Sequence, residues 1–216
     1  MNEKNNERKF DYSSLFHRLS HYFIINTIFW PFYFFRYKIK IIGAENIPTD
    51  NLPFLFISNH YSYEDPPLLS LALRRPIAYI AKKELFAEKW LGPTINFLGA
   101  IPIDRNKTGL STIKTIKEAL KNNWLVGIFI EGTRNLSRTE MTKLEEGTAF
   151  IARVTGKTRV LPMALRGGEK VFDKLEIHIG KIIEFQSDLS AEEMTLIYGQ
   201  KVAELAGLEL QLKPKN

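Results

Sequence analysis

The polar residues best suited to chemistry stand directly after short apolar runs. One group, NHYSYED at 59–65, follows the apolar residues 54–58. A carboxylate five positions after a histidine, across a turn, can bond one imidazole nitrogen. That bond fixes the tautomer and leaves the other nitrogen free to accept a proton. The spacing therefore predicts that Asp65 orients His60 as a proton acceptor, although a histidine that merely bonds backbone at a turn is the alternative.

A second polar group ends the segment GAIPIDR at 99–105. Its hydrophobic run stops abruptly at Asp104 and Arg105, which places a guanidinium at the predicted edge of a sheet. The planar fork of arginine suits phosphate. A surface ion pair between the two residues is the alternative.

A third group, EGTR at 131–134, follows the apolar run LVGIFI. Gly132 permits a close approach of backbone to a ligand, and Glu131 and Arg134 are delivered to the same strand end. An ordinary turn with solvated charges is the alternative. The three groups together, each after a strand, favour a functional site.

The elements that must position these groups alternate between strand and helix. Strands are predicted at 54–58, 77–81, 100–103, 125–130 and 160–165, with one or two more in 175–185 hinging at Gly180; helices are predicted at 67–73, 88–97, 112–121, 143–155 and 191–206. Ser190 and Glu193 form a capping box for the last helix. This alternation predicts an α/β fold with a largely parallel, mixed sheet flanked by helices, in which ligands bind at the carboxyl ends of the strands.

The first 38 residues have a different character. The run YFIINTIFWPFYFF at 22–35 carries no charge and is flanked by basic residues. It is shorter than the ~20 apolar residues of a spanning helix, and no small-residue cleavage site follows it. We expect Pro31 to divide the region into helices at 11–29 and 31–36 that lie in the membrane interface. A buried helix pair and a true span are the alternatives. Residues 39–216 are expected to form one catalytic domain.

Composition excludes several classes of protein. The chain has no cysteine and only 4 histidines, which removes disulfides, cysteine nucleophiles and cysteine-ligated zinc. No HExxH spacing is present, so no metal is expected. The formal net charge of +6 favours anionic partners such as a membrane surface. The basic residues are dispersed and no nucleic-acid recognition motif occurs, so nucleic acid is not an expected partner.

These motifs together resemble those of the glycerolipid acyltransferases, the family that includes the 1-acylglycerol-3-phosphate acyltransferases. The resemblance rests on NHYSYED at 59–65, GAIPIDR at 99–105, EGTR at 131–134, VLPMAL around Pro162, and AKKELF at 81–86. It covers about 54–165. Pro102 stands where many members carry phenylalanine, a change expected to leave Arg105 in place.

The resemblance implies transfer of a fatty acyl group to the sn-2 hydroxyl of 1-acylglycerol-3-phosphate, giving phosphatidic acid. The implied acyl donor is acyl-CoA or acyl-carrier protein, which is a co-substrate, and no cofactor is implied. His60 would be the general base and Asp65 its orienting partner. The residues implied to bind the glycerophosphate head are Lys82, Arg105, Glu131, Gly132, Thr133 and Arg134. Asn59 and the backbone after His60 are expected to stabilise the tetrahedral oxyanion.

Several alternatives remain open at this point. Ser58 and Ser62 lie near His60 in the sequence, so a serine nucleophile is a secondary route. The acceptor could instead be glycerol-3-phosphate or another lysolipid. A basic membrane-surface binding module without catalysis is the non-enzyme alternative. The expected location is the cytoplasmic face of a membrane, as a peripheral or monotopic protein.

Overall fold

A mixed sheet forms the centre of the molecule. The computed structural model describes residues 10–104, 109–156 and 159–212. Within them, eight strands form one sheet in the order β1-β8-β7-β2-β5-β3-β4, with β9 paired to β7. The strands are β1 (Lys38–Ile42), β2 (Leu55–Ser58), β3 (Ile77–Lys82), β4 (Ile101–Ile103), β5 (Leu125–Phe129), β7 (Arg159–Gly167), β8 (Lys174–Ile179) and β9 (Ile183–Glu184).

The strand directions confirm a largely parallel, mixed sheet. All pairs are parallel except that β7 runs antiparallel to both β8 and β9. The central strand β2 is buried along its whole length, as expected for a parallel strand with both faces covered. The predicted 175–185 region is indeed two strands. Three strands were not predicted: β1, and the short β6 (Glu140–Met141) and β10 (Glu209–Leu210), which pair with each other.

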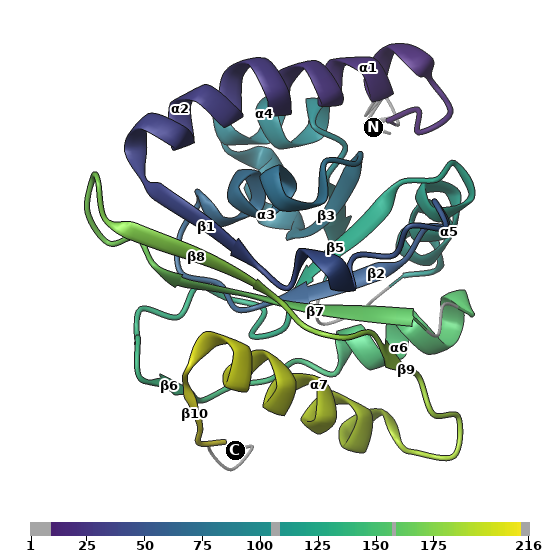
Figure 1. Cartoon of the computed structure of the whole chain (residues 1–216). Helices are drawn as coiled ribbons and strands as arrows, with labels where there is room; N and C mark the ends of the chain where they lie inside the picture. Colours follow the sequence, from purple (N-terminus) through teal and green to yellow (C-terminus); the bar gives the residue numbers. More distant parts are fainter. Residues whose placement is uncertain (1–9, 105–108, 157–158, 213–216) are drawn as a thin grey trace.

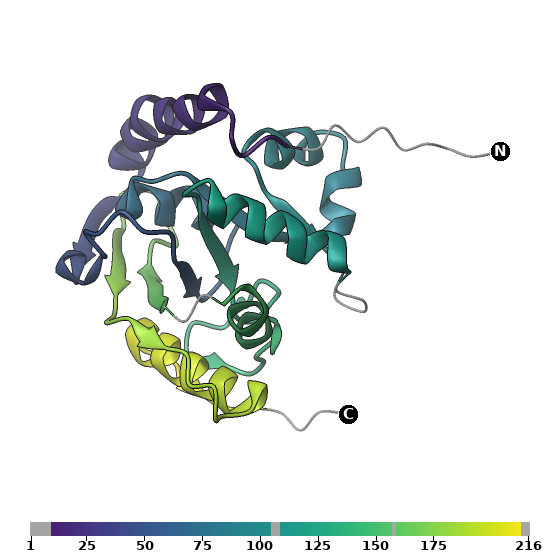
Figure 2. The same ribbon diagram turned by 90° about the vertical axis from the view of Figure 1, so that its right-hand side faces the viewer.

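Helices cover both faces of the sheet (Figure 1). The N-terminal helices, α3 (Asp65–Leu73) and α4 (Leu91–Phe97) lie on one face, and α6 (Gly147–Thr155) and α7 (Ala191–Ala206) lie on the other. The view in Figure 2 shows the same two layers from the side, with α5 (Leu110–Lys121) crossing toward α6. Short 3₁₀ turns occupy Ala44–Asn46 and Lys83–Ala87. Helix α7 begins at the predicted capping box, with both reciprocal hydrogen bonds formed.

The N-terminal segment is a single helical rod, and the predicted division at Pro31 is wrong. Helix α1 (Leu15–Phe23) continues through a π-helical stretch, Ile24–Phe29, into α2 (Trp30–Arg36). Pro31 lies in the first turn of α2. The π-helical turn directly before it has wider spacing, which accommodates the proline ring and its missing N–H. The rod begins at 15 rather than 11 because Ser14 caps it, accepting a hydrogen bond from the backbone N–H of His17.

The two sides of this rod have opposite environments. Its inner side chains join the core, among them Ile25 and Tyr33, and Tyr12 just before it donates a hydrogen bond to the carbonyl of Gly99. The outer side chains remain exposed: Leu15, Phe16, Leu19, Phe23, Ile28, Trp30, Phe32, Phe34 and Phe35. Among the described residues, no helix is both long and apolar enough to cross a membrane.

Candidate active site

The fold brings His60 and Asp65 into contact. His60 follows β2, and Asp65 is the first residue of α3. The imidazole Nδ1 lies 2.7 Å from Asp65 Oδ2. The same oxygen accepts the backbone N–H groups of Tyr61 at 2.6 Å and Ser62 at 2.9 Å. These bonds fix the position of the carboxylate at the start of α3.

The His60 imidazole packs against aromatic side chains. The His60 ring stacks on Phe129 at 3.9 Å between centroids, with 16° between the planes, and Phe129 in turn stacks against Tyr79. Because Nδ1 is engaged by Asp65, Nδ1 carries the ring proton, and Nε2 is the nitrogen with a lone pair to offer. His60 lines the large cavity of the molecule. The arrangement suits removal of a proton from a molecule held there.

Glu131 is a positioning residue, which corrects its expected role in substrate binding. Its side chain is buried and does not line the cavity. One carboxylate oxygen accepts the Asn135 side-chain amide at 2.6 Å, and the other lies 3.4 Å from the backbone N–H of His60. Asn135 also donates its backbone N–H to the His60 carbonyl at 2.7 Å. Burial raises the pKa of Glu131 to about 7.

The remaining residues of the EGTR motif do face the cavity. Gly132, Thr133 and Arg134 all line it. Gly132 has a φ of +66°, a conformation that favours glycine. The Arg134 guanidinium lies over the Tyr63 ring, 3.9 Å from its centroid, which holds the cation beside the histidine motif.

Lys82 joins Arg134 on the cavity wall. It is the last residue of β3, and it pairs with Ile103 at the end of β4. Arg105 lies outside the described residues. Lys82 and Arg134 thus both line the cavity that His60 lines.

Asn59 has a structural role instead of the expected oxyanion role. Its side chain is fully buried, donating to the Leu165 carbonyl at 3.0 Å and accepting from the Leu165 N–H at 2.9 Å. It therefore ties the end of β2 to β7, and it does not line the cavity where a substrate would bind.

The backbone after His60 is equally occupied, because the N–H groups of Tyr61 and Ser62 both bond Asp65. The expectation that they form an oxyanion site is therefore wrong. The serine route finds no support either. The Ser62 hydroxyl donates to Asp65 at 3.1 Å, and the buried Ser58 hydroxyl donates to Asn59.

The cavity that His60 lines has a volume of about 1370 Å³. Apolar residues of the N-terminal rod, β3 and α4 form part of its wall, among them Ile24, Phe29, Ile80, Leu91, Ile95 and Leu98. The charged residues of the wall are Lys82, Arg134, Lys143, Glu145, Glu146 and Glu192. The site thus combines a proton acceptor, several charged side chains and an apolar space. Among the described residues, no group of three or more histidine, aspartate or glutamate side chains is placed to hold a metal ion.

Sequence reasoning missed the residues that seat the histidine. Phe129 and Tyr79 come from two other strands, and Asn135 follows the EGTR motif at a turn. None of the three carries a motif of its own. Only the pairing of β5 with β2 and β3 reveals that their side chains converge.

A parallel α/β sheet that presents a carboxylate-oriented imidazole at its edge, beside cations and an apolar cavity, defines an enzyme with a general-base site. Comparison with known families makes this specific. The chain belongs to the acyltransferase family, whose model matches residues 38–166.

Individual relatives support the assignment. The 1-acyl-sn-glycerol-3-phosphate acyltransferase of Bacillus subtilis is 35% identical over 183 residues, 79% of this chain and 89% of that protein. The chloroplastic enzyme of the same name from Arabidopsis thaliana is 30% identical over 72% of this chain, but the match spans only 44% of its own length. The crystal structure of the 1-acyl-sn-glycerophosphate acyltransferase of Thermotoga maritima superposes with a TM-score of 0.67, covering 88% of this chain and 78% of that one; at 24% identity this likeness shows the fold alone.

Proposed function

We propose that this acyltransferase moves a fatty acyl group from an acyl thioester to the sn-2 hydroxyl of 1-acylglycerol-3-phosphate, giving phosphatidic acid. The observation that carries the proposal is the His60–Asp65 pair, at 2.7 Å, beside a cavity with cationic and apolar walls. A substrate with an anionic head and a hydrocarbon tail complements such walls. The names of the relatives support the same acceptor.

The reaction begins when the acceptor hydroxyl gives its proton to His60 Nε2. The hydroxyl oxygen then forms a bond to the thioester carbonyl carbon, and a tetrahedral oxyanion results. Collapse of this intermediate breaks the carbon–sulfur bond, and the leaving thiolate takes the proton back from His60. Asp65 stabilises the transient imidazolium throughout. A positioned base of this kind contributes ~10²–10⁴-fold to the rate.

The acceptor head is held by the cations beside His60. Arg134 and Lys82, which line the cavity, bind the phosphate in this proposal, with Arg105 as a third candidate from the motif. Gly132 and Thr133 present backbone at the same wall. Holding the hydroxyl next to Nε2 supplies the larger share of catalysis, since correct placement of two reactants is worth ~7–11 kcal/mol.

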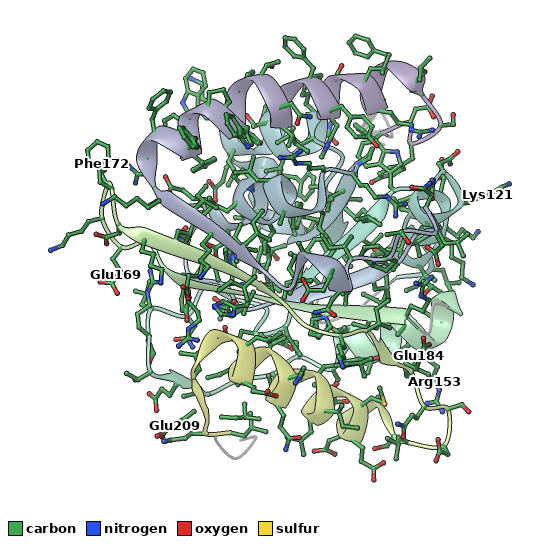
Figure 3. The ribbon with its side chains drawn as sticks, viewed as in Figure 1. Lys121, Arg153, Glu169, Phe172, Glu184 and Glu209 are labelled. Carbon is green, nitrogen blue, oxygen red and sulfur yellow. The ribbon has the colours of Figure 1, made fainter. Side chains whose placement is uncertain are left out.

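The N-terminal rod binds the membrane from which the acceptor comes. Its outer face is a continuous set of exposed aromatic and aliphatic side chains (Figure 3). Phe172, which is 67% exposed at the tip of the β7–β8 hairpin, extends this surface beside the end of α2, where its backbone N–H donates to the Arg36 carbonyl. Aromatic side chains with basic residues nearby suit an anionic interface. The enzyme lies on the cytoplasmic face as a peripheral or monotopic protein, with acyl-CoA or acyl-carrier protein as its donor.

Replacing the proposed base tests this function. The purified chain is given labelled 1-acylglycerol-3-phosphate with either donor, and the lipid product is identified. His60→Ala should abolish transfer. His178→Ala is the matched control, because His178 also bonds a carboxylate, that of Glu176 at 3.0 Å, but in β8 and away from the cavity. Comparable turnover in the His60 variant would end the proposal, and preference for glycerol-3-phosphate or another lysolipid in parallel assays would change the acceptor.

A further inference from the structure

The short strand β6 is hydrogen-bonded on both of its edges. On one edge it pairs with β10, close to the C-terminus (Figure 1). The backbone N–H groups of Glu209 and Gln211 donate to the two carbonyls that flank Glu140, at 2.8 and 3.0 Å. On the other edge, the carbonyl of Glu140 itself accepts the side-chain amide of Asn135 at 2.9 Å. The strand therefore connects Asn135 to the end of the chain.

The Asn135 side chain uses all of its polar groups. A side-chain amide offers two N–H donors and one carbonyl acceptor. The donors bond the Glu131 carboxylate at 2.6 Å and the Glu140 carbonyl, and the acceptor takes the backbone N–H of Ser137 at 2.9 Å. Aspartate has no such donors, and serine has only one. The contacts therefore require asparagine among side chains of this size.

The same asparagine holds the backbone of His60 on both sides of its Cα. The backbone N–H of Asn135 donates to the His60 carbonyl at 2.7 Å. The His60 N–H lies 3.4 Å from one oxygen of the Glu131 carboxylate, whose other oxygen is bonded by the Asn135 amide. Asp65 orients the imidazole ring, whereas Asn135 holds the peptide groups from which the ring projects. The position of Nε2 depends on both.

Strand β10 is itself fixed by the core. Gly207 ends α7 in the left-handed conformation, with a φ of +69°. The next side chain, Leu208, is buried in the hydrophobic core. The strand therefore leaves α7 at a defined point and meets β6 there. Asn135, Glu140 and Gln211 do not line the cavity, so their contribution to the reaction has to pass through His60.

We infer that Asn135 is a positioning residue for the base His60, and that β10 is the segment that keeps Asn135 in place through β6. This inference rests on the proposed function, in which His60 takes the proton of the acceptor. It assigns a part in the reaction to backbone groups about 150 positions after the histidine. A displacement of ~1 Å in a reacting group can cost ~10²-fold in rate, so small movements at this strand matter.

Two variants test the two parts of the inference in the full-length protein. Asn135→Ala removes the side-chain amide. Gln211→Pro removes the N–H that β10 donates to β6, at an exposed side chain. Gln211→Ala separates the loss of that N–H from the loss of the side chain, which bonds only Glu209.

Asn46→Ala is the matched control for loss of a long-range asparagine contact. Asn46 is half-buried like Asn135, and its amide donates to the Ile179 carbonyl at 2.9 Å, but it does not line the cavity. Thermal unfolding of every variant checks its fold. Asn135→Ser replaces Asn135→Ala if the alanine variant does not fold.

Steady-state kinetics give the first readout. In Asn135→Ala kcat should fall by up to ~100-fold, while the KM for acceptor stays nearly constant because no cavity residue is changed. Gln211→Pro should show a smaller loss in the same sense. Asn46→Ala should lose thermal stability but keep the wild-type kcat, which separates positioning from general destabilisation.

The second readout needs no turnover. Proton–nitrogen correlation spectra of the histidine rings identify the His60 signals as those that disappear in His60→Ala. The Nδ1–H signal of His60 should shift in Asn135→Ala and Gln211→Pro and keep its wild-type position in Asn46→Ala. Absence of acyl transfer by the wild type would refute the proposed reaction only, because the ring signals still report the position of His60. An unchanged His60 signal, or an unchanged kcat, in a folded Asn135 variant would overturn the inference.

Discussion

The Tyr37 hydroxyl donates a hydrogen bond of 2.5 Å to the carboxylate of Glu64, the residue directly before Asp65. Arg36 Nε pairs with the same carboxylate at 3.0 Å. The C-terminal end of the N-terminal rod is thus bonded to the turn that orients His60. Glu64 therefore connects the rod to this turn.

Tyr37→Phe should loosen this connection. The ring is buried and can stay in place, while the hydrogen bond to a charged partner is lost, so the free energy of unfolding should fall by about 1–2 kcal/mol. Turnover should fall with little change in the KM for acceptor, since the substituted group does not line the cavity. Urea unfolding and steady-state kinetics measure both effects. Tyr22→Phe is the control, because the Tyr22 hydroxyl makes no hydrogen bond within the described part of the chain; equal effects from both variants would contradict the link.

Glu131→Gln should change how stability depends on pH. The pKa of Glu131 is raised by burial to about 7 in the folded protein from an ordinary value near 4.5. The stability that the protonated form provides is therefore complete below about pH 4.5 and is lost as pH rises through 7. Glutamine stays neutral at every pH. The free energy of unfolding of the variant should therefore rise relative to that of the wild type across this pH range, by at most about 3 kcal/mol at pH 8. Chemical unfolding of both proteins at several pH values measures the difference. If the stabilities of the variant and the wild type change with pH in parallel, the raised pKa of Glu131 is contradicted.

Asp65→Asn should lower kcat by about 10²–10⁴-fold without removing acceptor binding. An asparagine oxygen can still accept from the His60 ring and from the Tyr61 and Ser62 N–H groups, so the turn should remain folded. The negative charge that stabilises the imidazolium is lost, however. Kinetics with circular dichroism as a check on the fold test this. A variant with wild-type kcat would show that the carboxylate only holds the turn.

Arg134→Ala should weaken acceptor use specifically. Loss of a charged contact to phosphate should lower kcat/KM for the acceptor by about tenfold to a hundredfold, while the KM for the donor stays nearly constant. Arg138→Ala is closely matched, since the Arg138 guanidinium lies over the Tyr61 ring at the same 3.9 Å but does not line the cavity. If both variants lose acceptor affinity equally, the loss comes from the lower positive charge of the protein as a whole and not from a contact between Arg134 and the phosphate.

Replacing Phe32 and Phe35 by serine should reduce binding to anionic vesicles. Both are exposed on the outer face of the rod, so the fold should be unaffected. Each substitution removes apolar surface that the membrane interface would bury. Vesicle co-sedimentation measures the loss. Leu136→Ser serves as the control, because Leu136 is 84% exposed but belongs to the loop after the EGTR motif. Unchanged co-sedimentation of the phenylalanine variant would contradict membrane binding through this face.

Local patterns were predictable because their partners are close in the chain. The His60–Asp65 contact lies within one turn, and the Ser190–Glu193 capping box lies within one turn of helix. The central strands and the mixed sheet were likewise visible in the short apolar runs between helices. The strand β1 was missed because the lysine and isoleucine residues at 38–42 form a strand by pairing with β8, which is far away in the sequence.

The sequence by itself determined which residue types could do the chemistry: an imidazole with a carboxylate one turn away, and cations after neighbouring strands. Tertiary structure alone decided how the surrounding residues are used. Asn59 bonds Leu165, 106 positions away, and Trp124 bonds Tyr12, 112 positions away. Such contacts depend on strand order and on the packing of the rod against the sheet, so no local spacing encodes them. For the same reason the sequence did not reveal that Glu131 is a buried residue that bonds Asn135.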